Sequence, residues 1–492
     1  HASSHRQRRC ALSTLMVLDR LLSLKIACRY KLKKSLMLLI ANSFSRVANY
    51  LFTLFTANIL LLSEYGLLSA IMPFQSLILV LSSFGIAPSV SRFTSIFESE
   101  NKKEKISSSL LFVPIGFFFL LILFILFPIL WGFYSPNIQE GIDIPLKIIL
   151  LVIPLGVLFS VFTGILLGIK KVNYMAISIF ALSFSYFLLS VPLSYIFRVL
   201  GASASIVGGY LVGILVSFFL VIKSGANLKI KRIDTREFKK IFKFAIPVSI
   251  FSLSLVLLFN ADIYMLAHFF GPEIVGIYGM ASPTAGIIPS FAIALSAVLL
   301  PELSKVKNPG KDEIDKILTS LKASFEITMP VALSLFAFSN PIIFFLFGVK
   351  EGGVVLKLLA IAMLFYSIFY VASTSLQAMN KQAIPMKITV LIAGINVILN
   401  YILIPKYNIN GAAFATMVSC IIGMFLIIKS LGISFLPDKR FTFFFFSIFI
   451  LMIVFENYVG LFNSRITNLL AYGGFGTPLI LVYFYYLKTK WK

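Results

Sequence analysis

The stretch GASASIVGGYLVG (Gly201–Gly213) returns 210 residues later as GAAFATMVSCIIG (Gly411–Gly423), with a glycine at both ends of each copy. The same offset pairs Gly66, within SEYGLLSAIMPF, with Gly276, within EIVGIYGMASPT. A single offset shared by separate regions is the signature of an internal repeat. The chain is therefore predicted to contain two copies of one structural unit.

The composition places these copies in a membrane. Of the 492 residues, 59% are hydrophobic and 13% are charged, and the mean hydropathy is +0.97. About fourteen apolar stretches between residues 35 and 487 are each long enough to cross a hydrocarbon core, which takes about 20 helical residues. Because lipid offers the backbone no hydrogen-bond partner, such stretches form helices. The predicted fold is an all-α integral membrane protein with about fourteen transmembrane helices.

The repeat divides these helices into two lobes. Each copy holds about six spans, so both copies enter the membrane from the same side and are related by a pseudo-two-fold axis along its normal. The predicted units are a basic N-terminal cytoplasmic segment (1–34), an N-lobe (35–222), a cytoplasmic linker (223–243), a C-lobe (244–431) and two extra spans (441–487). Parallel repeats around a central site are a known transporter architecture, in which the lobes rock.

The basic residues set the orientation. The sequence holds 43 lysines and arginines against 19 acids. With the N-terminus in the cytoplasm, the inside connections hold 27 of the basic residues and the outside ones 6. This distribution follows the positive-inside rule, so both termini are predicted to be cytoplasmic. The charge is thereby explained without nucleic acid, and the basic N-terminal segment is expected to contact anionic membrane lipids.

Polar residues form a stripe along the first span. Asn42, Arg46, Asn49, Thr53 and Thr56 follow one another at intervals of 4, 3, 4 and 3, which places them on one helix face. An arginine inside the bilayer is costly unless it faces a partner or water. Arg46 alone could instead extend to the headgroups. That alternative explains one residue and not five, so the stripe favours a polar cavity.

The second copy carries an acid in its first span. Asp262 and Asn260 lie about two turns from the predicted outer end, and an acid at such a depth is a candidate for ion coupling. A buried structural pair with a lysine or arginine explains Asp262 equally well. Asn396 and Asn400 stand one helical turn apart on a later span, where core packing is the favoured interpretation.

No metal site or disulfide framework is expected. Cys10, Cys28 and Cys420 are the only cysteines and are widely separated, and only one of the three histidines, His268, lies beyond the first five residues.

Two stretches carry a resemblance to a known family. They are ANILLLSEYGLLSAIMPFQSLILVLSSFGIAPSVSRF (Ala57–Phe93) and NADIYMLAHFFGPEIVGIYGMAS (Asn260–Ser282). Both resemble the polysaccharide flippase branch of the multidrug/oligosaccharidyl-lipid/polysaccharide (MOP) exporter superfamily, in which a Gly-Pro-acid turn follows the first span of each lobe. The second stretch fits this pattern, whereas the first has Leu62 and Ser63 in place of Gly-Pro.

The resemblance implies a cavity between the lobes, lined mainly by spans one, two, seven and eight. Gln75 of the second span then joins Arg46, Asn42, Asn49 and Thr53 as a candidate cavity residue. Members of this branch move lipid-diphosphate-linked saccharides across the cytoplasmic membrane. The resemblance implies such a flippase, not an enzyme, without a cofactor beyond a coupling Na+ or H+. Glycosyltransferases or a polymerase are the implied protein partners.

Two other function classes are weighed against this one. A cation-coupled exporter of drugs or metabolites is favoured by Asp262 but opposed by Arg46 and the two extra spans. A membrane glycosyltransferase or polymerase would need a sizeable aqueous loop with acids or histidines for acid–base chemistry. The predicted outside connections are short and poor in histidine.

Overall fold

The computed structural model describes most of the two predicted lobes. The described ranges are 44–83, 86–100, 143–225, 235–293, 311–379 and 381–433, with isolated residues between 109 and 125 and residue 296. The predicted segments 1–34 and 441–487, and much of the third span, lie outside these residues. The described residues form helices joined by short turns and contain no strand, which confirms the all-α fold.

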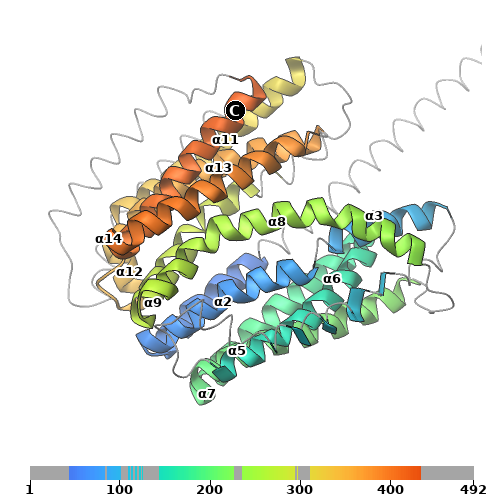
Figure 1. Cartoon of the computed structure of the whole chain (residues 1–492), viewed down its shortest axis with the longest axis horizontal. Helices are drawn as coiled ribbons and strands as arrows, with labels where there is room; N and C mark the ends of the chain where they lie inside the picture. Colours follow the sequence, from blue (N-terminus) through green and yellow to red (C-terminus); the bar gives the residue numbers. More distant parts are fainter. Residues whose placement is uncertain are drawn as a thin grey trace, which may run out of the picture.

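The helices gather into two bundles (Figure 1). The N-lobe comprises residues 44–59, α2 (Leu62–Ser83), α3 (Ile86–Ser99), α5 (Asp143–Leu150), α6 (Val152–Gly168) and α7 (Val172–Lys223). The C-lobe comprises α8 (Thr235–Phe269), α9 (Pro272–Ala285), α11 (Lys311–Ala337), α12 (Ser339–Phe347), α13 (Gly353–Ala378) and α14 (Ala383–Leu431). In Figure 1, α8 runs along the boundary between the bundles, where it packs against α14 and α2.

Several helices are suited to crossing a membrane. Among the described residues, five helices are long and apolar enough, or six if the bent pair 314–337 and 339–347 is one span. The predicted number of about fourteen is therefore not confirmed. Two of these helices are far too long for a single crossing, since α7 has 52 residues and α14 has 49. A straight helix of 50 residues would be about 75 Å long, against a hydrocarbon core of about 30 Å.

Each of the two long helices is a hairpin. In α7 the backbone is non-helical at Arg198, and the arms on either side pack closely, since a Cβ added at Gly209 would lie 2.3 Å from the Cβ of Tyr186. In α14 the break is at Asn408, and the arms are joined by a 3.0 Å hydrogen bond from Asn396 to Thr416. Each therefore contains two of the predicted spans.

The 210-residue offset of the sequence recurs in the backbone. Arg198 has φ 54° and ψ −131°, and Asn408, 210 positions later, has φ 52° and ψ −136°. A Cβ added at Gly201 or at Gly411 would meet the carbonyl oxygen of the residue eight positions earlier, at 1.8 and 2.4 Å. Both hairpins therefore turn in the same way, and both need a glycine for the close approach after the turn.

The lobes meet where α2 crosses α9. A Cβ added at Gly66 would lie 1.8 Å from the carbonyl oxygen of Pro272, and one added at Gly276 would lie 2.9 Å from that of Leu62. Leu62 and Pro272 are themselves 210 positions apart. The contact is thus made twice by equivalent residues, as expected for helices that cross on a pseudo-two-fold axis. We call it the α2–α9 crossing.

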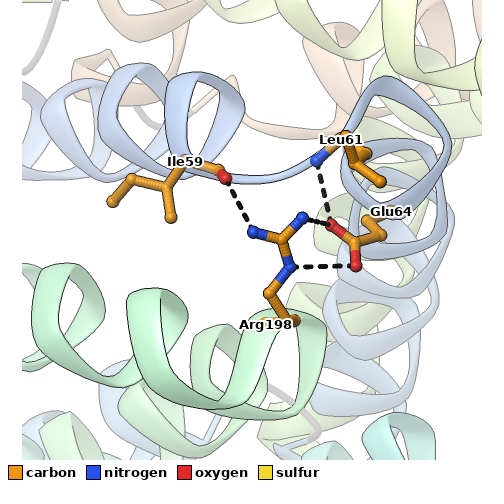
Figure 2. A network of polar contacts seen from close by, with 4 residues as sticks. All are labelled: Ile59, Leu61, Glu64 and Arg198. Carbon is orange, nitrogen blue, oxygen red and sulfur yellow. Dashed lines mark hydrogen bonds and ion pairs between the residues drawn. The ribbon is translucent and has the colours of Figure 1, made fainter.

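A polar network fixes the N-lobe at this same end (Figure 2). Glu64 accepts a 2.9 Å hydrogen bond from the backbone N–H of Leu61, which precedes α2, and so caps the helix. Its carboxylate also forms a 2.8 Å ion pair with Arg198. Arg198 donates further to the carbonyl of Ile59 at 3.2 Å. The turn of α7 is thereby attached to the junction between the first two helices.

Candidate functional site

A cavity of about 480 Å3 lies between the lobes. Its wall comes from the first helix, α2 and both arms of α7 in the N-lobe, and from Pro283 of α9 and the residues that follow it in the C-lobe. Hydroxyl and amide side chains make up much of the wall. Those chains belong to Ser45, Asn49, Tyr50, Thr53, Gln75, Ser76, Ser183, Tyr186, Tyr210 and Ser290. Such a surface offers both donors and acceptors to a polar ligand.

Four of the candidate cavity residues line this cavity together. They are Arg46, Asn49, Thr53 and Gln75, whereas Asn42 lies outside the described residues. The first three stand on one face of the first helix because their spacing follows the helical period. Thr56, the last residue of the predicted stripe, is fully buried and donates to the carbonyl of Phe52 at 2.6 Å.

Arg46 gives the cavity its charge. It is exposed on the wall and is the only charged residue among the described residues that line it. A cation in a partly desolvated cavity attracts anionic groups, and a guanidinium can bind a phosphate through two parallel hydrogen bonds.

Three tyrosines extend the polar wall beyond the stripe. Tyr186 donates to Asn49 Oδ1, and Tyr210 faces the same space. The hydroxyl of Tyr50 lies 3.2 Å from that of Thr284 in the C-lobe and so bridges the lobes beside the cavity. None of these three tyrosines is among the cavity residues predicted from the sequence. Tyr186 and Tyr210 are fixed as cavity residues only by the turn of α7, which brings the two arms side by side.

A second polar site lies inside the C-lobe. Asp262 of α8 is 2% exposed and accepts hydrogen bonds from three uncharged side chains. Asn400 Nδ2 donates to it at 2.6 Å, Thr416 Oγ1 at 2.6 Å, and Tyr278 of α9 donates through its hydroxyl. The donors compensate the burial of the carboxylate. The network links α8, α9 and both arms of α14.

Asn400 also bonds to Asn396 at 3.0 Å, yet its own side-chain oxygen is buried without a hydrogen-bond partner. The amide nitrogen of Asn400, and not its oxygen, faces the carboxylate, so a turn of the amide group would bring this oxygen to Asp262 and give the all-oxygen donor set that hard cations prefer. The i, i+4 spacing of the two asparagines predicted core packing, and both are fully buried. The contact of this pair with Asp262, made through Asn400, was not predicted from the sequence. The available signal was the presence of two amides one helical turn apart on an apolar span.

Asn260, the other ion-coupling candidate, makes a local contact. Its amide donates to the carbonyl of Val256 on the same helix at 2.9 Å. The structure thus brings the cavity candidates together in one place and places Asp262 in a separate site within the C-lobe.

Two family models match overlapping parts of the chain. Residues 31–307 match the model of a family described as polysaccharide biosynthesis protein, and residues 247–402 match that of the MatE family. The first match covers the cavity residues and Asp262, and the second covers most of the C-lobe.

Two individual proteins are similar to this chain in sequence. An uncharacterized membrane protein of Methanocaldococcus jannaschii is 29% identical over 425 residues, or 81% of this chain and 98% of the relative. The probable lipid II flippase MurJ of Thermotoga maritima is 30% identical over 158 residues, or 30% of this chain and 32% of the relative.

Among solved structures, the lipid II flippase MurJ in an inward closed conformation has the same fold. The TM-score is 0.74 at 20% identity, over 93% of this chain and 99% of that chain. Since the model of the polysaccharide biosynthesis proteins matches more than half of the sequence, the chain belongs to that family.

Proposed function

We propose that this protein is a flippase that carries a lipid-linked saccharide across the cytoplasmic membrane. The observation that carries the proposal is the cavity between the lobes, in which Arg46 is the only charged wall residue described and the other polar wall residues carry hydroxyls or amides. A phosphate-linked sugar presents one anionic group and many hydroxyls. The names of relatives such as the probable lipid II flippase support the same substrate class.

In this proposal Arg46 binds the diphosphate that joins the lipid to the sugar. Asn49, Thr53 and Gln75 are close enough along the same wall to hydrogen-bond the sugar hydroxyls. The lipid tail would remain in the bilayer, so the cavity has to hold only the head group. No bond is made or broken, and the work is translocation rather than catalysis.

The proposed orientation makes this structure closed on the outside. With both termini in the cytoplasm, the α2–α9 crossing lies at the outer end of the lobes. Asn58 of the first helix adds a second contact between the lobes there, donating to the carbonyl of Leu346 at 2.8 Å. Rocking of the lobes would break these contacts and open the cavity outward. Impermeant thiol reagents applied outside should label Leu61→Cys and spare Lys170→Cys.

We also propose that Asp262 binds the coupling cation, Na+ or H+. The buried carboxylate and the unpartnered oxygen of Asn400 support a cation at this point. Coupling requires only that the cation bind one conformation of the lobes more tightly than the other. Asn260 is then a neighbour of the site rather than a ligand, since its amide bonds to its own helix.

Reconstitution into proteoliposomes tests the function. A lipid-linked saccharide placed in one leaflet should reach the other leaflet faster with the protein than without it, and Na+ or pH gradients should change the rate. Protein-free vesicles and vesicles with Arg46→Ala protein provide the controls. Equal translocation rates in vesicles with the parent protein, in protein-free vesicles and in vesicles with Arg46→Ala protein would contradict the proposed flippase function.

A cation-coupled exporter of small molecules is the second candidate, because the MatE match covers Asp262 with two of its partners, Tyr278 and Asn400. It differs in cargo rather than in coupling. Efflux of cationic dyes from the same proteoliposomes, without translocation of the glycolipid, would establish it instead.

A further inference from the structure

Helix α9 makes two different kinds of contact within one turn. Gly276 and Gly279 pack against α2 at the crossing, where a Cβ added at Gly279 would lie 2.4 Å from Ser69 Oγ. Tyr278, between the two glycines, is fully buried and turns its hydroxyl to Asp262 on α8. The residue that bonds to the acid is therefore part of the helix segment that closes the outer end.

The packing at this segment leaves little room for adjustment. Gly276 would place a Cβ 3.3 Å from the Cα of Gly66, so the two backbones are in contact. The carbonyl of Gly279 accepts a 3.1 Å hydrogen bond from the hydroxyl of Tyr65 on α2. A shift of α9 by a few tenths of an ångström would therefore disrupt the packing at the crossing. Close-packed interfaces change between discrete arrangements rather than deform smoothly.

We propose that Tyr278 is a positioning residue that links cation binding at Asp262 to the closure of the outer end. The proposal rests on the coupling role of Asp262 described above, with Na+ as the coupling cation. While the carboxylate is free of a cation, it holds the hydroxyl of Tyr278 and so keeps α9 in the crossing. A cation among Asp262 and Asn400 takes up the carboxylate oxygens, the tyrosine loses its acceptor, and α9 is released from one of its two anchors.

The reverse relation follows from thermodynamic linkage. If release of Tyr278 favours opening of the outer end, then opening of the outer end must raise the affinity of Asp262 for the cation by the same factor. The outward-open state would then load the cation from outside, and its loss inside would restore the bond and the closure. Cation binding and the side of the membrane to which the cavity opens are thus coupled through the hydrogen bond between Tyr278 and Asp262.

Two spin labels can report the closure without any glycolipid. Phe197 and Tyr407 lie at equivalent positions beside the two hairpin turns, and they are 56% and 61% exposed. Cysteines at both positions, in a protein whose native cysteines are replaced by alanine, carry the labels. Pulsed electron paramagnetic resonance then measures the distance between the lobes at the outer end, with increasing Na+ and with K+ as the control for ionic strength.

The decisive variant is Tyr278→Phe, which keeps the ring and removes the hydroxyl. In the parent protein, Na+ should move the distance distribution towards longer values. In Tyr278→Phe the longer distances should already be present without Na+, and the response to Na+ should be lost or its midpoint lowered by roughly tenfold or more, the range expected for a hydrogen bond to a charged group.

Tyr65→Phe is the matched control. It removes the other tyrosine hydroxyl at the crossing, the one that bonds to Gly279, but leaves the Asp262 network intact. This variant should also lengthen the distance without Na+, yet respond to Na+ with the amplitude of the parent. A purely structural role of Tyr278 predicts the same behaviour in both variants.

Two results would overturn the link. One is a Tyr278→Phe protein whose Na+ response equals that of Tyr65→Phe in amplitude and midpoint. The other is a parent protein whose distance distribution ignores Na+. Glycolipid translocation in proteoliposomes is measured separately, so a protein that flips its substrate while showing either result would retain the flippase function and lose only the link.

Discussion

The two lobes share a backbone but differ in charge at equivalent positions. Arg46, on the wall of the cavity, corresponds to Val256 in the C-lobe, and Asp262 corresponds to Phe52 in the N-lobe. Where the C-lobe has a carboxylate with three hydrogen-bond donors, the N-lobe has a fully buried ring that packs against Tyr186 at a centroid distance of 5.2 Å. The positively charged side chain of the cavity, Arg46, belongs to the N-lobe, and the buried acid, Asp262, belongs to the C-lobe.

The shared residues are those that the backbone needs. Gly66 and Gly276 allow the helices to cross, and Gly201 and Gly411 follow the hairpin turns. The residues that differ carry the proposed chemistry. In this proposal a duplicated scaffold supports the motion of both lobes, while the proposed anion site at Arg46 and the proposed cation site at Asp262 can be adjusted separately. The predictions below test this division by changing one lobe at a time.

The largest effect should come from Arg46→Ala. Loss of the guanidinium removes a charge-assisted contact of about 1.5–3 kcal/mol, so glycolipid binding should weaken roughly tenfold to hundredfold and translocation should nearly stop. Arg46→Lys should rescue in part, because the charge stays and the paired donors are lost. The measurements are glycolipid-induced thermal stabilisation and translocation in proteoliposomes.

Val256→Ala is the control, since it truncates the equivalent position of the other lobe. It should leave glycolipid binding within about twofold of the parent, as expected away from a contact. If Arg46→Ala translocated the substrate at the parent rate, Arg46 would not be the anion site of the cavity, and the proposal would be wrong.

Asp262→Asn should have the next largest effect. The amide keeps the shape of the side chain and removes its charge, so cation binding should fail while glycolipid binding persists. We expect the Na+- or pH-dependent part of the rate to fall roughly tenfold, within the range of ordinary coupling free energies. Translocation rates at several Na+ concentrations and pH values measure it.

Glu326→Gln neutralises another buried acid of the C-lobe, which is 4% exposed and lies on α11. Its translocation should keep the cation dependence of the parent. Equal losses in Asp262→Asn and Glu326→Gln would mean that any buried acid of this lobe matters in the same way.

Most of the fold could be predicted from periodic features of the sequence. Apolar stretches of helical length and the 210-residue offset are both one-dimensional patterns. The distribution of lysines and arginines predicts the orientation in the membrane, which stays a prediction. The stripe through Arg46, Asn49 and Thr53 is of the same kind, because a helix converts intervals of three and four into a face. These three residues therefore lie together on the cavity wall.

The Asp262 network could not be predicted in this way. Its members, Asp262, Tyr278, Asn400 and Thr416, come from three helices separated by up to 154 residues, and their meeting depends on how α14 folds back beside α8. Each residue alone is compatible with ordinary core packing. The backbone conformation at Asn408 fixes which faces of the two arms of α14 meet, and the pattern of apolar residues does not reveal it.

The equivalence of the crossing can be tested at its two glycines. Gly66→Ala places a methyl group 1.8 Å from the carbonyl oxygen of Pro272, whereas Gly276→Ala places one 2.9 Å from that of Leu62. Neither backbone oxygen can swing away as a side chain would. We expect Gly66→Ala to destabilise the closed outer end by about 1–3 kcal/mol, the usual effect of overpacking, and Gly276→Ala to do so less.

The distance between labels at Phe197 and Tyr407 would lengthen more in Gly66→Ala than in Gly276→Ala. Gly271→Ala serves as the control, because a Cβ there meets nothing within 4 Å. A crossing that carries no part of the closure would give the same distance in all three variants.

The smallest effect should come from the two hairpin turns, where the lobes have the same backbone and different side-chain partners. Asn408 and Arg198 both hold a positive φ that glycine adopts without strain. Asn408→Gly relieves the strain and removes an oxygen that is buried without a hydrogen-bond partner, so it should stabilise the protein by about 1 kcal/mol after the entropy of glycine is counted.

Arg198→Gly relieves the same strain but loses the ion pair with Glu64 and the bond to Ile59 (Figure 2). The Arg198 side chain is 43% exposed, and a pair in that setting contributes about 0–1 kcal/mol, so the gain and the loss should nearly cancel. Thermal unfolding in detergent should therefore show a higher midpoint for Asn408→Gly and little change for Arg198→Gly. A marked loss in Arg198→Gly would mean that the network around Glu64 holds the N-lobe turn more firmly than an exposed pair can, and that the lobes differ in their turns as well as in their sites.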